Sequence, residues 1–338
     1  MLSLILTKRA RYSVYGVAFF GLGIVCTLGI QTLLSSSGKV ISTAISLREK
    51  VDSDLISPLL LCGESKASYE STQMTKEVSS YINTKIDTDG IKNISFYFRD
   101  LNNSKWTGVN EDDQYTPASL MKIPIMIAVY RRAETDPTIL SKEIYFDGSF
   151  DLNKVESIKP AKEIEQGKSY SVSELIKYMI SYSDNNATTL LLKLVSPRDM
   201  SKIFQDLGLP SPDGTSVGTI DYMSARNYAH IFRVLYNATY LSQEYSLKAL
   251  ELLLTPDFAE GLIAGIPTGM RLANKFGERT VYDSQGAPVY SELHDCGIVY
   301  YPNSPYLVCV MTKGSNFVAL ENVIKDISKI VYTNFQKN

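Results

Sequence analysis

Histidine is scarce in this chain of 338 residues, which has only His230 and His294. Two isolated histidines provide none of the ligand spacings that zinc sites use, so we expect no metal and no cofactor. Basic residues are not in excess either, because the net charge is −2 and the pI is near 5.9. Without a basic surface, nucleic acid is not an expected partner.

Cysteine is scarce as well. The four cysteines do not form the pattern of a disulfide framework. Cys296 and Cys309 fall on neighbouring predicted strands, and we expect both to be free buried thiols. Apolar residues make up 44% of the chain, as in globular proteins, and the length allows one large or two ordinary domains.

An uncharged stretch, residues 12–34, follows the basic residues Lys8, Arg9 and Arg11 near the N-terminus. A helix needs about 20 apolar residues to span a bilayer, and positive flanks stay on the cytoplasmic side. We therefore expect residues 1–11 to be a cytoplasmic tail and residues 12–34 to be a transmembrane signal-anchor in the lipid bilayer. The rest of the chain is then extracytoplasmic. A cleaved signal peptide is the alternative.

The remaining chain divides into a linker and one folded domain. Residues 35–73 are rich in Ser, Lys and Glu and are typical of a stalk. Beyond them, strand patterns at both ends enclose a mostly helical block, and an apolar stripe closes the chain as a helix. This order predicts an α+β fold, in which terminal helices flank an antiparallel sheet (74–115 and 266–338) and an all-helical lobe (116–265) is inserted.

Ser119 and Lys122 open a strongly apolar run, residues 123–130. Positions i and i+3 share a helix face, so the Lys122 ammonium can reach the Ser119 hydroxyl. Burial lowers the pKa of a lysine, and a neutral amine can take a serine proton. The pair predicts a nucleophile activated without histidine. A helix-capping serine beside a solvated lysine is the alternative.

Two further motifs follow in order along the chain. Ser183-Asp184-Asn185 interrupts the helical block after a capping box at residues 171–174, and Lys275-Phe276-Gly277 ends a predicted strand. With Ser119-x-x-Lys122, they resemble the Ser-x-x-Lys, Ser-Asp-Asn and Lys-Thr-Gly motifs of class A β-lactamases and penicillin-binding proteins. The resemblance extends from about residue 74 to the end of the chain.

The resemblance implies a role for each matching residue. Ser119 would be the acylated nucleophile, Lys122 its base, and Ser183 the relay of a proton to the leaving nitrogen. The backbone N–H groups of Ser119 and Glu278 would form the oxyanion hole. The substrate-binding residues so implied are Asn185 for an amide side chain, Lys275 for a carboxylate, and Gly277, Glu278 and Arg279 beside them.

One departure from the family concerns hydrolysis of the acyl-enzyme. Class A β-lactamases use a glutamate after Ser-Asp-Asn to position the water, but no glutamate stands between Glu174 and Glu244 here. Asp213 and Asp221 are the candidates to replace it, although their side chains are shorter. Without a base that activates the water, acylation would be faster than deacylation.

A second departure is Phe276, where the family has Thr or Ser. A phenyl ring cannot donate a hydrogen bond to a substrate carboxylate, so Arg279 is the candidate to supply charge there instead. The neighbours His294 and Asp295 do not suggest a triad with a serine, because adjacent strand residues point to opposite faces.

The sequence therefore predicts a membrane-anchored, extracytoplasmic serine hydrolase of the class A β-lactamase-like family. Its substrate would be a β-lactam or a D-amino-acid peptide, and an acyl-Ser119 intermediate would form. Two alternatives remain. One is a non-hydrolytic relative that binds cell-wall peptides or a partner protein, and the other is a peptide or ester hydrolase unrelated to cell walls.

Overall fold

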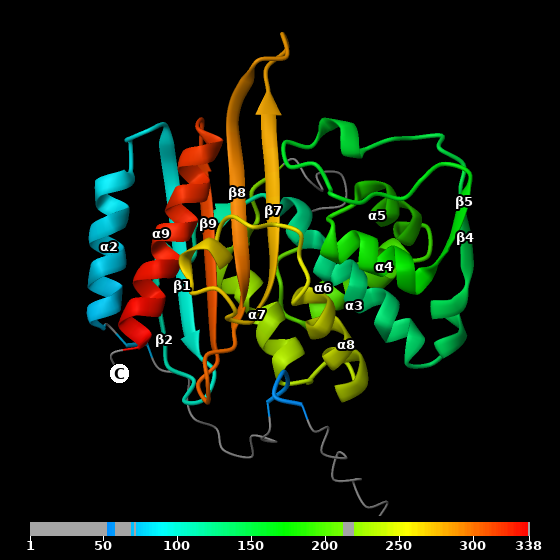
Figure 1. Ribbon diagram of the computed structural model, residues 1–338, viewed down its shortest axis with the longest axis horizontal. Helices are drawn as coiled ribbons and strands as arrows, with labels where there is room; N and C mark the ends of the chain where they lie inside the picture. The colour runs from blue at the N-terminus through cyan, green and yellow to red at the C-terminus, as the bar shows by residue number, and fades with distance from the viewer. Residues whose placement is uncertain (1–52, 58–68, 71, 212–219, 337–338) are drawn as a thin grey trace, which may run out of the picture. The chain divides into compact units, whose positions relative to one another are not determined.

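The computed structural model describes residues 53–57, 69–70, 72–211 and 220–336. Within these ranges, strands from both ends of the chain form one antiparallel sheet in the order β2-β1-β9-β8-β7 (Figure 1). The strands are β1 (Ile91–Asp100), β2 (Trp106–Val109), β7 (Leu272–Tyr282), β8 (Pro288–Val299) and β9 (Tyr306–Gly314). The predicted antiparallel sheet is confirmed.

Both faces of this sheet are buried. Along β1, Phe96 and Phe98 enter one hydrophobic core, whereas Tyr97 enters the other. The same alternation occurs along β9, where Val308 and Cys309 enter different cores. Successive strand side chains point to opposite faces, so the sheet separates the two cores.

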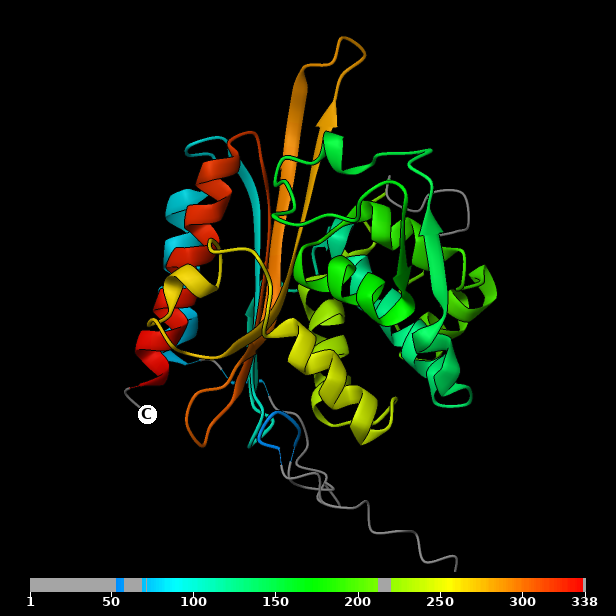
Figure 2. The same ribbon diagram turned by 45° about the vertical axis from the view of Figure 1, so that its right-hand side comes forward.

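Two helices, α2 (Gln73–Lys85) and α9 (Phe317–Phe335), cover one face of the sheet (Figure 2). The α2 helix begins at a capping box formed by Thr72 and Thr75, which satisfies backbone N–H groups of the first turn. The buried stripe of α9 matches the apolar stripe of the sequence. It includes Leu320, Val323, Ile324, Ile327 and Val331.

A block of helices covers the other face, where α7 contacts β1, β8 and β9 (Figure 2). Its helices are α3 (Lys122–Ala133), α4 (Val172–Ser181), α5 (Asn185–Leu192), α6 (Pro197–Asp206), α7 (Ala225–Tyr236) and α8 (Gln243–Leu253). This part of the chain also contains two short antiparallel strand pairs. They are β3 (Gln114–Tyr115) with β6 (Met223–Ser224) and β4 (Glu143–Phe146) with β5 (Lys168–Ser171). The 3₁₀ helices are η1 (Ala118–Met121), η2 (Pro137–Ser141), η3 (Asn153–Val155) and η4 (Ile263–Gly265).

The expectation of two free thiols in the sheet is wrong. Cys296 of β8 and Cys309 of β9 lie directly opposite each other and form a disulfide, with their Cα atoms 4.0 Å apart. The sequence placed them on neighbouring strands but did not give the strand register. That register decides whether two sulfurs meet.

Part of the predicted stalk packs against the fold. Leu55 and Ile56 are buried, and the Leu55 carbonyl accepts a hydrogen bond from the Tyr300 hydroxyl at 3.0 Å. The predicted membrane span and most of the stalk lie outside the described residues. No helix in the described part of the chain is long and apolar enough to cross a membrane.

Candidate active site

Ser119 lies on η1, the single 3₁₀ turn that leads directly into α3. The turn follows Pro117, and Ala118 has a positive φ of 49°, which redirects the chain into the helix. All residues of α3 except Arg131 and Arg132 are buried. Ser119 itself is partly exposed, so its hydroxyl stands at the surface end of a buried helix.

Lys122 folds back onto Ser119 as the helix spacing predicts. Its Nζ donates to the Ser119 Oγ at 2.9 Å, and the side chain is only 3% exposed. Burial lowers the Lys122 pKa to about 8, although the negative charges of Glu156, Asp184 and Glu278 oppose the shift. A minor fraction of the Lys122 amine is therefore neutral at pH 7, and a neutral amine can accept the Ser119 proton.

Ser183 lies between the two buried lysines. Its Oγ accepts hydrogen bonds from the Lys122 Nζ at 2.9 Å and from the Lys275 Nζ at 3.0 Å. Burial and the charge of Lys122 lower the Lys275 pKa well below its usual range. Two ammonium groups that share one hydroxyl repel each other, so the arrangement favours one neutral amine and a continuous path for protons.

The turn at Ser183 is fixed by its neighbour Asp184, the N-cap of α5. Ser183 has a positive φ of 58°, and the fully buried Asp184 carboxylate holds that backbone in place. The carboxylate accepts from the backbone N–H groups of Asn186, Ala187 and Ile164 and from the Asn153 side chain. These contacts tie α5 to the loop between β4 and β5.

Gly277 allows β7 to lie directly against the Ser119 turn. A Cβ atom at this position would lie 2.9 Å from both the Leu120 nitrogen and the Pro117 carbonyl oxygen, so a larger residue would push the strand away. Lys275 and Glu278 therefore flank the Ser119 turn on the same strand. This placement brings together all three sequence motifs.

Asn185 faces a carboxylate that sequence reasoning missed. Its Nδ2 donates to the Glu156 Oε1, and Glu156 lies on the loop between β4 and β5. The Glu278 side chain reaches the same loop and accepts from the Ile158 N–H at 2.6 Å. Burial and the adjacent Glu156 raise the pKa of Glu278. No sequence motif marks Glu156, because only the fold brings this loop to the site.

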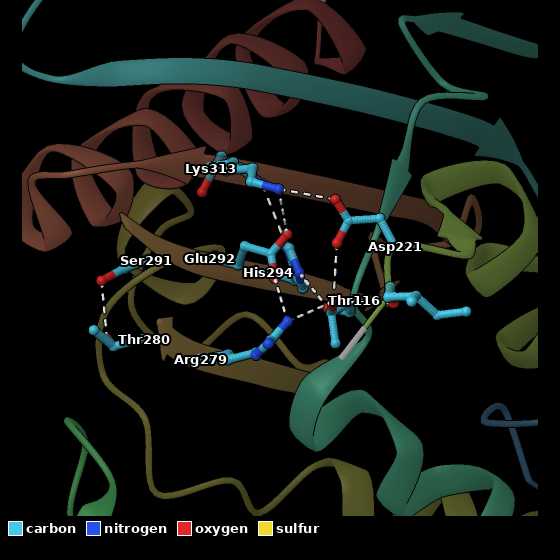
Figure 3. A network of polar contacts seen from close by, with 10 residues as sticks. Thr116, Asp221, Arg279, Thr280, Ser291, Glu292, His294 and Lys313 are labelled. Carbon is cyan, nitrogen blue, oxygen red and sulfur yellow. Dashed lines mark hydrogen bonds and ion pairs between the residues drawn. The ribbon is translucent and has the colours of Figure 1, made fainter. Parts of the chain in front are cut away.

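Arg279, which we expect to supply charge beside a substrate, contacts the segment that precedes Ser119. Its Nη1 donates to the Thr116 Oγ1 at 2.8 Å, three residues before Ser119 (Figure 3). The Asp221 carboxylate accepts from the same Thr116 hydroxyl at 2.9 Å and pairs with Lys313 at 2.8 Å. Arg279 and Asp221 thus both hold the segment before Ser119. The Asp221 carboxylate is already bonded to Thr116 and Lys313. Asp213 lies outside the described residues.

A buried carboxyl, Glu292, lies at the centre of this cluster (Figure 3). Lys313 and Arg279 approach it to 3.5 and 3.8 Å. Burial and the charge of Asp221 raise the Glu292 pKa to about 7, although the charges of Lys313 and Arg279 oppose the shift.

Nearby, the His294 Nε2 bonds the Thr116 carbonyl at 3.0 Å, and burial lowers the pKa of His294 to about 4. His294 is thus a packed neutral residue behind the site.

Stability should depend on pH through Glu292. Because the folded protein holds this proton more tightly than the unfolded chain, its free energy of unfolding should fall as pH rises from about 4.5 to about 7. Glu292→Gln removes the titrating group and therefore this pH dependence of the free energy of unfolding. The stability of the variant relative to wild type should therefore rise across that window by roughly 2–4 kcal/mol. Urea unfolding at several pH values tests this against the exposed control Glu251→Gln, and parallel curves for Glu292→Gln and wild type would contradict it.

Phe276 is 3% exposed and packs its ring against Phe258, with centroids 4.3 Å apart. The ring therefore belongs to the core on the α2–α9 side and offers no hydroxyl donor at this position.

As for metals, the described residues contain no cluster of three or more histidine, cysteine or acidic side chains placed to hold an ion.

Comparison with known proteins agrees with this geometry. The model of the Beta-lactamase enzyme family matches residues 76–335, most of the chain. The chain belongs to this family. No curated protein matches the sequence significantly. The match includes Ser119, Lys122, Ser183 and Lys275, so the family assignment and the cluster of motifs describe the same region.

Solved structures share the fold. A variant of PBP-A, solved as its acyl-enzyme complex with penicillin G, is 21% identical with a TM-score of 0.66, covering 80% of this chain and 99% of that one. The β-lactamase of Sphaerobacter thermophilus is 21% identical with a TM-score of 0.63, covering 78% and 98%. The class A β-lactamase of Mycobacterium abscessus is 20% identical with a TM-score of 0.63, covering 78% and 99%. At these identities the likeness establishes the fold alone.

Proposed function

We propose that this protein is acylated on Ser119 by β-lactams or D-amino-acid peptides and releases the acyl group slowly. The observation that carries the proposal is the hydrogen-bonded chain from Ser119 through Lys122 and Ser183 to Lys275, with Nζ–Oγ distances of 2.9 to 3.0 Å. It supplies a nucleophile, a base with a pKa near 8 and a route for the proton. PBP-A, which shares the fold, has been seen as a penicillin G acyl-enzyme.

In the proposed acylation, the Lys122 amine takes the Ser119 proton as the Ser119 Oγ bonds to the carbonyl carbon of the lactam. The developing oxyanion would receive hydrogen bonds from the backbone N–H groups of Ser119 and Glu278, and each such donor lowers a barrier by roughly 3 kcal/mol. The carbon–nitrogen bond then breaks, and Ser183 passes a proton to the leaving nitrogen. The product is a serine ester with an opened ring.

Slow deacylation is proposed because no acidic side chain of the described residues, which do not include Asp213, contacts Ser119. Asp221, the one described acidic residue in the chain between α6 and α7, is bonded to Thr116 and Lys313. Glu156 and Glu278 contact Asn185 and Ile158. Water would therefore reach the ester without a dedicated base, and general base catalysis commonly contributes about 10²–10⁴-fold.

Membrane anchoring is part of the proposal and rests on the sequence. Residues 12–34 would hold the protein in the cell membrane with its folded domain on the extracytoplasmic side, where cell-wall peptides occur. Carbonate extraction of membranes, with a variant lacking residues 1–34 as control, tests this. Release of the full-length protein would contradict an anchor.

The second candidate is a non-hydrolytic relative that only binds cell-wall peptides or a partner. Covalent labelling with a fluorescent penicillin separates the two functions. We expect label on the wild-type protein and none on Ser119→Ala, whereas Ser201→Ala, a change on the exposed surface of α6, labels like wild type. Absence of label on the wild-type protein, together with binding of a D-Ala-D-Ala peptide, would favour the second candidate.

A further inference from the structure

A cavity of about 350 Å³ lies between β1, β2 and α7, beside the chain that leaves α6. The described residues of its walls are rich in cations and aromatic rings, and none of them is acidic. None of the residues that form the candidate active site lines it. The residues used below are Tyr97, Arg99, Trp106, Arg226, His230 and Arg233, and we call them the arginine pocket.

The three arginines of this pocket differ in their partners. Arg226 forms ion pairs with Glu111 at 2.6 Å and Asp112 at 3.0 Å, so its charge is compensated. Arg99 is 8% exposed, and no carboxylate of the described residues pairs with it. Arg233 likewise has no acidic partner in that part of the chain. Arg99, which is buried, and Arg233, which is partly exposed, thus share a cavity in which no described residue supplies a counter-ion.

The two uncompensated charges affect each other and the histidine between them. Burial and, to a smaller extent, the charge of Arg99 lower the pKa of Arg233. Burial and both arginines lower the pKa of His230 to about 4, so this imidazole is neutral. The Arg233 guanidinium donates to the His230 Nδ1 at 2.6 Å, which leaves the hydrogen on Nε2. All three side chains therefore offer donors and require an acceptor.

Buried cations without a partner are costly, and proteins tolerate them mainly where an anion completes the site. The planar guanidinium fork matches the oxygens of carboxylate and phosphate groups, and it forms two parallel hydrogen bonds with either. The pocket also has an apolar wall. Trp106 stacks on Tyr97 with centroids 5.8 Å apart, and Arg226 lies over the indole at 4.2 Å.

We propose that the arginine pocket binds a small organic oxyanion, with a carboxylate or phosphate group between Arg99 and Arg233 and an apolar group beside Trp106. A cavity of about 350 Å³ is within the range of small-molecule sites and exceeds the needs of a bare inorganic ion. The site is distinct from the serine and lysine cluster. It therefore does not depend on the proposed acyl-transfer function.

Thermal unfolding and calorimetric titration of the full-length protein test the proposal, with phenyl phosphate, benzoate and inorganic phosphate as probes at constant ionic strength. We expect phenyl phosphate or benzoate to raise the Tm and to bind more tightly than inorganic phosphate. The tighter of the two organic probes identifies the group that the pocket prefers. If neither changes the Tm or gives heat of binding, the proposal is wrong.

Substitutions then locate the binding. Arg99→Gln and Arg233→Gln should each lower the binding affinity for the organic probe at least tenfold. Arg198→Gln, which changes an exposed arginine on α6, should leave this affinity unchanged. Without a probe, either pocket variant should have an unchanged or higher Tm, because the repulsion between the Arg99 and Arg233 charges is removed. Arg233 is partly exposed, so Arg233→Gln provides the test if Arg99→Gln does not fold. Equal probe binding by wild type and the folded pocket variants would overturn the proposal.

Discussion

Replacing Lys122 with methionine is expected to slow the acylation of Ser119 by about 10²–10⁴-fold. The methionine side chain keeps much of the buried volume but removes the amine that lies 2.9 Å from the Ser119 Oγ. Without a base, the serine must lose its proton to water. Stopped-flow measurement of acylation by a chromogenic cephalosporin gives the rate constant directly.

The pH dependence makes this prediction specific to Lys122. Its pKa of about 8 means that the neutral, base-competent amine increases with pH, so wild-type acylation should rise toward a plateau above about pH 8. The acylation rate of the Lys122→Met variant should not show this rise with pH. Lys177→Met, on the exposed face of α4, should behave as wild type. A flat wild-type profile, or an unchanged rate in Lys122→Met, would mean that another group takes the proton.

Replacing Asp184 with alanine is expected to lower the free energy of unfolding by about 3–5 kcal/mol. The fully buried carboxylate accepts hydrogen bonds from three backbone N–H groups and one amide side chain. Truncation leaves these donors without an acceptor in the interior. It also removes the N-cap of α5, and caps of this kind are worth about 1 kcal/mol.

Urea unfolding at pH 7 measures this loss. Asp112→Ala is the matched control, because this exposed carboxylate forms one ion pair with Arg226 and should lose no more than about 1 kcal/mol. The Asp184 variant should also lose acylation in the fraction that folds, since the Ser183 backbone depends on the same carboxylate. Equal stability of the two alanine variants would show that water replaces the missing acceptor.

The sequence predicted the sheet and the terminal helices well, because their signals are local. The alternation of Phe96, Tyr97 and Phe98 between the two faces of the sheet and the apolar stripe of α9 follow from the two-residue and 3.6-residue periods of strands and helices. The Ser119 and Lys122 contact was predictable for the same reason, since helix geometry alone brings positions i and i+3 together.

Other features depend on how distant segments meet, which no local pattern records. Glu156 reaches Asn185 only because the loop between β4 and β5 folds over α5. Cys296 and Cys309 pair only because β8 and β9 adopt one particular register. The direction of Arg279, toward Thr116, likewise depends on where the segment before Ser119 passes β7.

The central claim is that Ser119 forms a long-lived acyl-enzyme, and intact-mass spectrometry over time after addition of benzylpenicillin tests it most directly. We predict that wild-type protein gains the mass of one whole penicillin within the dead time and keeps it for many minutes, while Ser119→Ala gains none. A transient adduct with turnover would contradict the claim, because it would require an efficient water-activating base. An adduct that persists equally on Ser119→Ala would place the acylated residue elsewhere.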